Sequence, residues 1–197
     1  LDGIRVGCYG GRAATRNGKL LPNVHIQNLL SSPLCDGLDA EVIVGAPAGE
    51  GVFERVTSAV RSIKGEPDFR LYVFDILNRP ELPFHDRYEM YQERCYQLRN
   101  KVPFLVPVQQ QRVGSLEELL AAEEAYLTDG YEGLMYRKFA GGYKYGRSTP
   151  KEAHLLKLKR WAECEAEVIG TYEQKENLNE AITDTLGRTV RSSHQEN

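Results

Sequence analysis

The 197-residue sequence has few cysteines and no long run of apolar residues. The four cysteines, Cys8, Cys35, Cys95 and Cys164, are scattered, form no C-x-x-C pair and have no histidine at metal-ligand spacing. This pattern argues against a zinc site and against a disulfide framework, and it favours a reducing cytoplasm. Because no apolar stretch approaches the length needed to span a bilayer, we expect no insertion into a membrane.

The sequence also lacks the phosphate-binding motif G-x-x-x-x-G-K-S/T. Residues 45–51 are rich in glycine but contain no lysine, so they are typical of a loop between a strand and a helix. The four histidines show no spacing typical of a catalytic triad, and we assign them no role. A P-loop mechanism is therefore excluded.

The net charge of -3 conceals an uneven distribution of charge. Residues 137–160 contain eight basic side chains and one acidic one, and residues 1–19 contain four basic side chains and one acidic one. These two stretches together carry +10, whereas the remaining residues carry -13. A basic face on an acidic body favours a polyanionic partner such as nucleic acid.

Strand and helix patterns alternate along the chain. Strands are predicted at 5–9, 13–16, 41–44, 69–77, 104–108, 132–138 and 155–159, and helices at 50–63, 85–98 and 115–126. The last helix begins with Ser115 and Glu118 at capping-box spacing. We expect an α+β domain with twisted antiparallel sheets and helices packed outside. After Arg160 a further strand is predicted at 165–172, followed by a polar tail.

Several short segments carry a family resemblance. They are, in order, Leu1-Asp2-Gly3-Ile4-Arg5, Asp39-Ala40-Glu41, Tyr72-Val73-Phe74-Asp75, Tyr131-Glu132-Gly133-Leu134-Met135 and Leu155-Leu156-Lys157-Leu158-Lys159. In order and spacing they resemble the motifs of ATP-dependent DNA ligases of the lysine-nucleotidyltransferase superfamily. The family's second motif usually reads Asp-Gly-Glu, and Ala40 replaces that glycine here.

The resemblance implies an ATP-grasp-like nucleotidyltransferase fold. It places an adenylation domain at residues 1–161, with its N-terminal part missing, and the beginning of an incomplete OB-fold β-barrel domain at residues 162–197. It also implies that the nucleophilic lysine stands immediately before Leu1. That lysine would take AMP from ATP as a phosphoramidate and pass it to a 5′-phosphate.

The resemblance assigns catalytic roles to Asp2, Arg5, Lys157 and Lys159. The last two alternate with Leu156 and Leu158, so a strand would place both ammonium groups on one face and both leucines in the core. Their charges could keep a nearby lysine amine neutral and could offset negative charge on the phosphates.

Nucleotide contacts are expected from Glu41 to the ribose, from Phe74 stacking on adenine, and from Arg5, Lys157 and Lys159. Phe74 offers the flat apolar face that stacking needs. Glu132, together with Glu41, is expected to bind Mg²⁺, which typically uses one or two protein carboxylates when it binds nucleotide phosphates.

Arg16 is expected to grip the 5′-phosphate at a nick, and Lys144 and Arg147 are secondary candidates for contact with the DNA backbone. The leading hypothesis is a monomeric, cytoplasmic ATP-dependent DNA ligase that seals nicked duplex DNA with ATP and Mg²⁺ in replication, repair or recombination. An RNA ligase and a GTP-using mRNA capping guanylyltransferase remain alternatives within the superfamily. A non-catalytic nucleic-acid-binding module on the same scaffold remains an alternative of another class.

Overall fold

The computed structural model describes residues 1–146, 148–160, 165–173, 179–183 and 189–191. The chain divides into two compact units, Leu1–Arg160 and Trp161–Asn197, and each is described by itself. None of the helices in the described residues combines the length and the apolar character that crossing a membrane requires.

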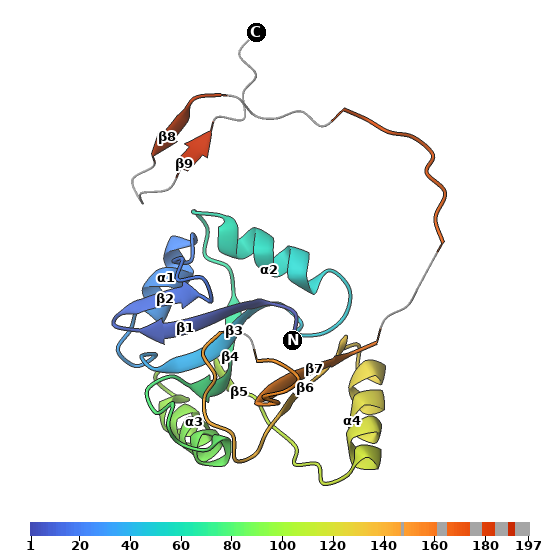
Figure 1. The fold of residues 1–197 in the computed structure, drawn as a ribbon. Coiled ribbons are helices and arrows are strands. Elements are labelled where there is room, and N and C mark those ends of the chain that lie inside the picture. The colour runs from blue at the N-terminus through green and yellow to red at the C-terminus, as the bar shows by residue number, and fades with distance from the viewer. Residues whose placement is uncertain (147, 161–164, 174–178, 184–188, 192–197) are drawn as a thin grey trace. The chain divides into compact units, whose positions relative to one another are not determined.

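A five-stranded sheet forms the centre of the first unit, with the strand order β2-β1-β3-β4-β5 (Figure 1). The strands are β1 (Ile4–Tyr9), β2 (Arg12–Thr15), β3 (Leu38–Val44), β4 (Phe69–Ile76) and β5 (Leu105–Pro107). One face of β3 and β4 is fully buried, because the cross-strand neighbours Val42 and Leu71 and the next pair, Ala40 and Val73, are all inaccessible to solvent. Val6 of β1, opposite Ala40, extends this buried face to the next strand.

Three helices contribute side chains to the same core. They are α1 (Val24–Leu30), α2 (Val52–Arg61) and α3 (Phe84–Leu98). Helix α2 inserts Val52, Val56 and Val60 at four-residue spacing, which places them on one face of the helix. Asn23 caps α1 by accepting a hydrogen bond from the Ile26 amide, so this short helix begins at a satisfied polar residue.

A second, two-stranded sheet consists of β6 (Gly133–Arg137) and β7 (Leu155–Lys159), which pair antiparallel. Helix α4 (Leu116–Thr128) lies beside it in Figure 1 and packs on β6. Ser115 caps α4 as predicted by accepting a hydrogen bond from the Glu118 amide. Arg160, directly after β7, pairs with Glu123 of α4 and so fixes the helix to the end of the strand.

The structure corrects several predictions. The sheets are not all antiparallel, because β4 and β5 run parallel and are connected through α3 as a β-α-β unit. Helix α1 was not predicted, because it is short and is held by its Asn23 cap and by its buried Ile26 and Leu30. Leu156 and Leu158 are half-buried rather than in the core.

The second unit contains a short antiparallel pair, β8 (Ala181–Thr183) and β9 (Thr189–Arg191). The strand predicted at 165–172 does not form, and residues 165–173 have no regular secondary structure. Val168, Ile169 and Tyr172 are almost fully exposed, so among the described residues of this unit these apolar side chains pack on no partner surface.

Candidate nucleotide site

The two motif glycines stand where a side chain would not fit. A Cβ atom on Gly3 would collide with the backbone carbonyl of Val42, so the start of β1 can lie against β3 only because the residue is glycine. Gly133 has a φ of 145°, and a Cβ atom on it would collide in the same way with the Leu158 carbonyl of β7. Each glycine therefore holds a motif segment tightly against the neighbouring strand.

Glu41 lies on β3 opposite Arg5 of β1. Its Oε1 atom accepts a hydrogen bond of 2.5 Å from the Gly3 amide. Because Gly3 follows directly on Asp2, this bond fixes the beginning of the chain beside the Glu41 carboxylate. Ala40 replaces the expected glycine and is fully buried. Because successive residues of a strand point to opposite faces, the methyl group of Ala40 lies on the face away from Glu41.

Glu132, Lys157 and Lys159 form a second group on the β6–β7 sheet. Lys159 Nζ lies 2.6 Å from Glu132 Oε2. The hydrogen bond from Lys159 lowers the pKa of the Glu132 carboxyl, and the charges of Lys159 and Lys157 lower it further. Lys157 pairs with Met135 and Lys159 with Gly133 across the sheet, so both lysines project from one face as predicted.

Phe74 is the extra residue of a β-bulge in β4. Asp39 pairs with Asp75 and Ala40 pairs with Val73, which leaves Phe74 without a cross-strand partner on β3. A bulge turns a side chain away from the regular alternation. The guanidinium groups of Arg5 and Arg137 lie 5.4 and 5.9 Å from the centre of the Phe74 ring. The half-buried ring therefore lies among cations at the side of the sheet that carries Arg5.

Arg5 is engaged by a buried acid that the sequence left without a role. Its Nε and Nη2 atoms donate to the two carboxylate oxygens of Asp39 at 3.0 and 2.6 Å. The hydroxyl of Tyr143 donates to Asp39 at 2.7 Å and accepts from Arg5 at 3.1 Å. Burial alone would lower the pKa of Arg5, but the hydrogen bond and charge of Asp39 raise it, so the guanidinium is permanently charged.

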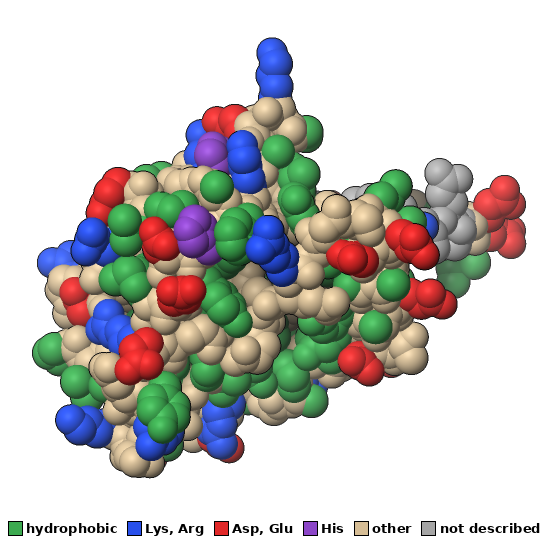
Figure 2. Space-filling view, turned by 90° about the horizontal axis from the view of Figure 1, so that it is seen from below, with side chains coloured by type: hydrophobic (Ala, Val, Ile, Leu, Met, Phe, Trp, Pro, Cys, Tyr) green, Lys and Arg blue, Asp and Glu red, His purple; other side chains and the backbone are tan. Residues whose placement is uncertain are grey.

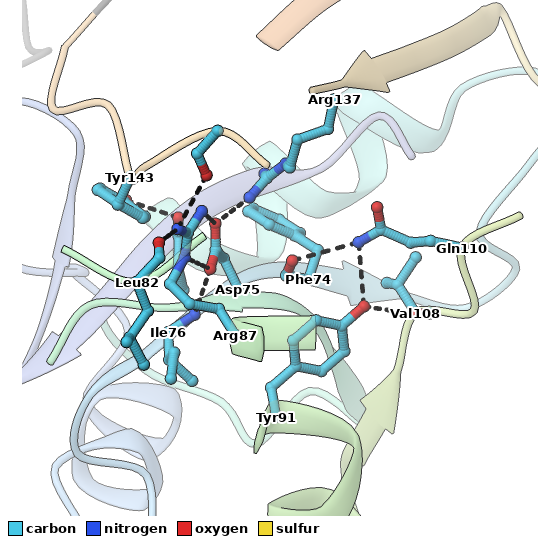
Figure 3. A network of polar contacts seen from close by, with 12 residues as sticks. Phe74, Asp75, Ile76, Leu82, Arg87, Tyr91, Val108, Gln110, Arg137 and Tyr143 are labelled. Carbon is cyan, nitrogen blue, oxygen red and sulfur yellow. Dashed lines mark hydrogen bonds and ion pairs between the residues drawn. The ribbon is translucent and has the colours of Figure 1, made fainter. Parts of the chain in front are cut away.

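Asp75 lies next to Asp39 and is fully buried. Arg87 of α3 contacts both of its carboxylate oxygens, at 2.8 and 3.2 Å, and Arg137 of β6 donates to one of them (Figure 3). Arg87 also donates to the carbonyls of Leu82 and Gly141. Burial lowers the pKa of Arg137 to about 10, so it stays charged at neutral pH. Two opposed buried carboxylates would repel each other, and three guanidinium groups and one tyrosine compensate them.

The predicted DNA-contact residues are spread over two loops. Arg16 is exposed in the turn after β2, which is closed by the bond from the Thr15 amide to the Lys19 carbonyl. Lys144 lies in the segment between β6 and β7 and is paired with Glu152 at 2.7 Å. Arg147 lies outside the described residues.

Figure 2 shows one face of the molecule, on which basic and acidic side chains are interspersed.

The structure thus brings Glu41 to the first three residues of the chain and pairs Glu132 with Lys159. It places Arg5 and Phe74 on the five-stranded sheet, and Lys157 and Lys159 on β7. Asp2 is half-buried and lies directly ahead of Gly3, which contacts Glu41. Among the described residues, no hydrogen bond or ion pair brings Arg16 or Lys144 into contact with these groups.

The sequence interpretation missed Asp39, Asp75, Arg87, Arg137 and Tyr143. One signal was present, because Arg87 occupies the buried stripe of α3 with Phe84, Tyr91 and Cys95 at helical spacing. A charged residue on such a stripe requires a buried partner. Tyr143, which directly precedes the predicted DNA-contact residue Lys144, hydrogen-bonds inside the protein.

No family model matches the chain. Over 100 residues it is 26% identical to a DNA ligase of African swine fever virus, an alignment that covers 50% of this chain and 24% of that protein. The structure of Chlorella virus DNA ligase-adenylate superposes with a TM-score of 0.70 at 32% identity, covering 81% of this chain and 60% of that one.

A structure of a Lig E DNA ligase superposes with a TM-score of 0.69 at 24% identity, covering 97% of this chain and 73% of that one, and this likeness concerns the fold. The resemblance to ATP-dependent DNA ligases that the motifs predict is therefore confirmed, as is the α+β architecture of their nucleotidyltransferase domain. The chain spans only about a quarter of the viral ligase aligned by sequence and 60% of the Chlorella virus enzyme.

Proposed function

We propose that the chain is the adenylation part of an ATP-dependent DNA ligase that seals nicks in duplex DNA. One observation carries the proposal: Gly3 donates a hydrogen bond to Glu41 and so fixes the beginning of the chain beside a predicted site carboxylate. A lysine is expected just before Leu1. It would enter next to the sheet that carries Glu41, while Lys159 pairs with Glu132 on the β6–β7 sheet.

The reaction would proceed by three displacements at phosphorus. The neutral lysine amine attacks the α-phosphate of ATP, a nitrogen–phosphorus bond forms, and pyrophosphate leaves. A 5′-phosphate oxygen of the nicked strand then attacks the same phosphorus and releases the lysine. Finally the 3′-hydroxyl attacks the 5′-phosphate, the new phosphodiester bond forms and AMP leaves.

The charges of the two lysines on β7 suit the first displacement. The ammonium groups of Lys157 and Lys159 would lower the pKa of a lysine amine placed beside them, and the neutral amine is the form that attacks. The same groups would stabilise negative charge on the phosphoryl oxygens and on the leaving pyrophosphate. Phe74 would stack on the adenine, Glu41 would bind the ribose, and Asp2 and Arg5 would contact the nucleotide during transfer.

The carboxylates fit Mg²⁺ bound together with a nucleotide. Among the described residues no group of three or more acidic, histidine or cysteine side chains could hold a metal alone. Magnesium that is bound through phosphates needs only one or two carboxylates, which Glu132 and Glu41 could supply. When bound, it would neutralise charge on phosphoryl oxygens. Residues 162–197 would begin an OB-fold domain, and Arg16, Lys144 and Arg147 would bind the DNA backbone.

The test is to incubate the full-length protein separately with α-labelled ATP and GTP, and then with nicked duplex DNA that carries a 5′-phosphate. We expect ATP to label the protein and the label to pass to the DNA. Lys159→Met should lower labelling by about 100-fold, because it removes one preorganised cation. Lys151→Met, which changes an exposed lysine before β7, is the matched control and should leave labelling unchanged.

Other results would select a different function. Labelling by GTP alone would indicate a capping guanylyltransferase, and transfer only to nicked RNA would indicate an RNA ligase. No labelling by either nucleotide, together with retained binding to nicked DNA, would leave the non-catalytic nucleic-acid-binding module.

A further inference from the structure

The two groups of predicted site residues lie on separate sheets that share no strand pairing. Glu41 and Phe74 belong to the five-stranded sheet, whereas Glu132, Lys157 and Lys159 belong to, or directly flank, the β6–β7 sheet. Their spacing therefore depends on whatever fixes one sheet to the other. Side-chain contacts near the acidic pair Asp39 and Asp75 supply this connection.

One of these contacts joins the two sheets directly, and a second joins the first sheet to the segment after β6. Arg137, on β6, reaches Asp75 on β4, and Tyr143, in the segment after β6, reaches Asp39 on β3. Figure 3 shows Arg137 and Tyr143 approaching the Asp75 cluster from different sides. The 13% exposed Arg137 side chain lies between Phe74 and Phe84, with its guanidinium 4.5 Å from the Phe84 ring centre. Two independent contacts fix an orientation as well as a distance.

Removing either contact leaves each carboxylate with another partner. Asp75 keeps both bonds from Arg87, and Asp39 keeps both bonds from Arg5. The five-stranded sheet and its core therefore retain their charge compensation without Arg137 or the Tyr143 hydroxyl. What is lost is one of the two side-chain contacts to β6 and the segment after it, while backbone hydrogen bonds such as that from the Tyr143 amide to the Pro80 carbonyl remain.

We propose that Arg137 and Tyr143 form a two-point joint on Asp75 and Asp39 that sets the distance between the two halves of the nucleotide site. Arg137 is thus a positioning residue for transfer of AMP, and this role rests on the proposed function. The Phe74 and Glu41 half holds the base and ribose, and the joint places Lys157, Lys159 and Glu132 at the phosphates.

Hydrogen exchange tests the joint without any nucleotide. The Tyr143 amide donates to the Pro80 carbonyl at 3.0 Å, and the His85 amide donates to the Phe139 carbonyl at 3.1 Å. These bonds connect the segment after β6 to the segment between β4 and α3 and to the first turn of α3. In Arg137→Met we expect both amides to exchange at least several-fold faster. The control is Arg70→Met, which removes a guanidinium from β4 whose partner, Asp68, is largely solvent-exposed. Unchanged exchange in Arg137→Met would overturn the joint.

The positioning role is tested by ATP binding and AMP transfer in the same full-length variants. Because a misplacement of about 1 Å can cost about 100-fold in rate, we expect Arg137→Met to slow transfer by 10- to 100-fold. The dissociation constant for ATP should rise much less, because the base and ribose half is intact. Tyr143→Phe should also slow transfer more than it weakens ATP binding, but to a smaller extent. Arg137→Lys should transfer AMP faster than Arg137→Met.

The outcomes separate the two proposals. Faster exchange with an unchanged transfer rate per active site would show that the joint does not position the nucleotide, and would overturn that role. Equal losses in transfer rate and in ATP affinity in Arg137→Met would also overturn the positioning role. A wild-type protein that neither binds nor transfers ATP would overturn the proposed function and with it the positioning role, while hydrogen exchange would still decide whether the joint exists.

Discussion

The five-stranded sheet and the β6–β7 sheet are built in different ways. The first has a continuous apolar core in which Val42, Leu71 and Val73 are fully buried. The second has no fully buried residue in either strand, and Met135 is 55% exposed. Apolar burial therefore fixes the sheet that carries Glu41 and Phe74, whereas polar contacts fix the sheet that carries Lys157 and Lys159.

This difference means that apolar burial supplies most of the stability, whereas polar contacts set the geometry of the site. Apolar burial is non-directional and tolerates small shifts, whereas a hydrogen bond to a carboxylate, such as that from Arg137 to Asp75, is directional. The sheet held by such contacts can be placed accurately, but it depends on a small number of residues. Substitutions at those residues should affect the two sheets unequally.

Asp75→Ala should cause the largest loss of stability, because Asp75 serves both sheets. It would leave Arg87, which is 1% exposed, as a buried charge without its carboxylate. Breaking a buried pair in this way costs about 3 to 5 kcal/mol, which urea unfolding would measure. Asp68→Ala, which removes an 88% exposed carboxylate paired with Arg70, is the control and should leave the unfolding midpoint unchanged. A loss below 1 kcal/mol in Asp75→Ala would refute the importance of the cluster.

Truncating one leucine in each sheet compares their cores directly. Leu71→Ala removes a fully buried side chain and should lower the free energy of unfolding by about 2 to 5 kcal/mol. Leu156→Ala removes a half-buried one, and should cost less than half as much because less apolar area is lost. Equal losses, measured by urea unfolding of the two variants side by side, would contradict the distinction between the sheets.

The sequence predicted the parts of the fold that have a regular period. Alternation in β4 and β7 and the four-residue spacing in α2 were sufficient to place these elements. The motif residues were found because each stands in a short, ordered segment of the chain. Asp39, Asp75, Arg87 and Tyr143 could not be assigned in the same way, because they are 12 to 104 residues apart from their partners and carry no local pattern that pairs them.

The parallel strand and the bulge show the same limit. Nothing in the short β5 segment distinguishes a parallel from an antiparallel neighbour, since the direction follows from how α3 returns the chain. The bulge leaves Phe74 unpaired because of the register of β3 against β4. That register cannot be predicted from the sequence of either strand alone.

Tyr143→Phe should have a smaller effect on stability than either substitution above. It removes one hydroxyl that donates to Asp39 and keeps the aromatic ring, so the expected loss is about 1 kcal/mol. Thermal and urea unfolding would measure it. Tyr9→Phe, which changes an exposed tyrosine of β1, provides the control and should be neutral. A similar loss in both variants would mean that the Asp39 contact contributes nothing specific.

The smallest expected effect concerns the ionisation of Glu132. Its pKa is depressed by Lys159, so Lys159→Met should raise it toward the ordinary value of glutamate. A depressed pKa contributes stability above the ordinary pKa of the group, and that contribution is lost as the pH falls through the folded-state value. Titration of the Glu132 carboxyl by NMR would measure the change. An unchanged pKa in Lys159→Met would show that the ion pair is absent in solution.

The site at which the nucleotide becomes attached tests the central claim most directly. After incubation of the full-length protein with ATP, peptide mapping by mass spectrometry should find AMP on a lysine immediately before Leu1, between the Glu41 and Glu132 sides of the site. AMP attached to any other residue, or no attachment at all, would contradict the assembly of a nucleotide site from the two sheets.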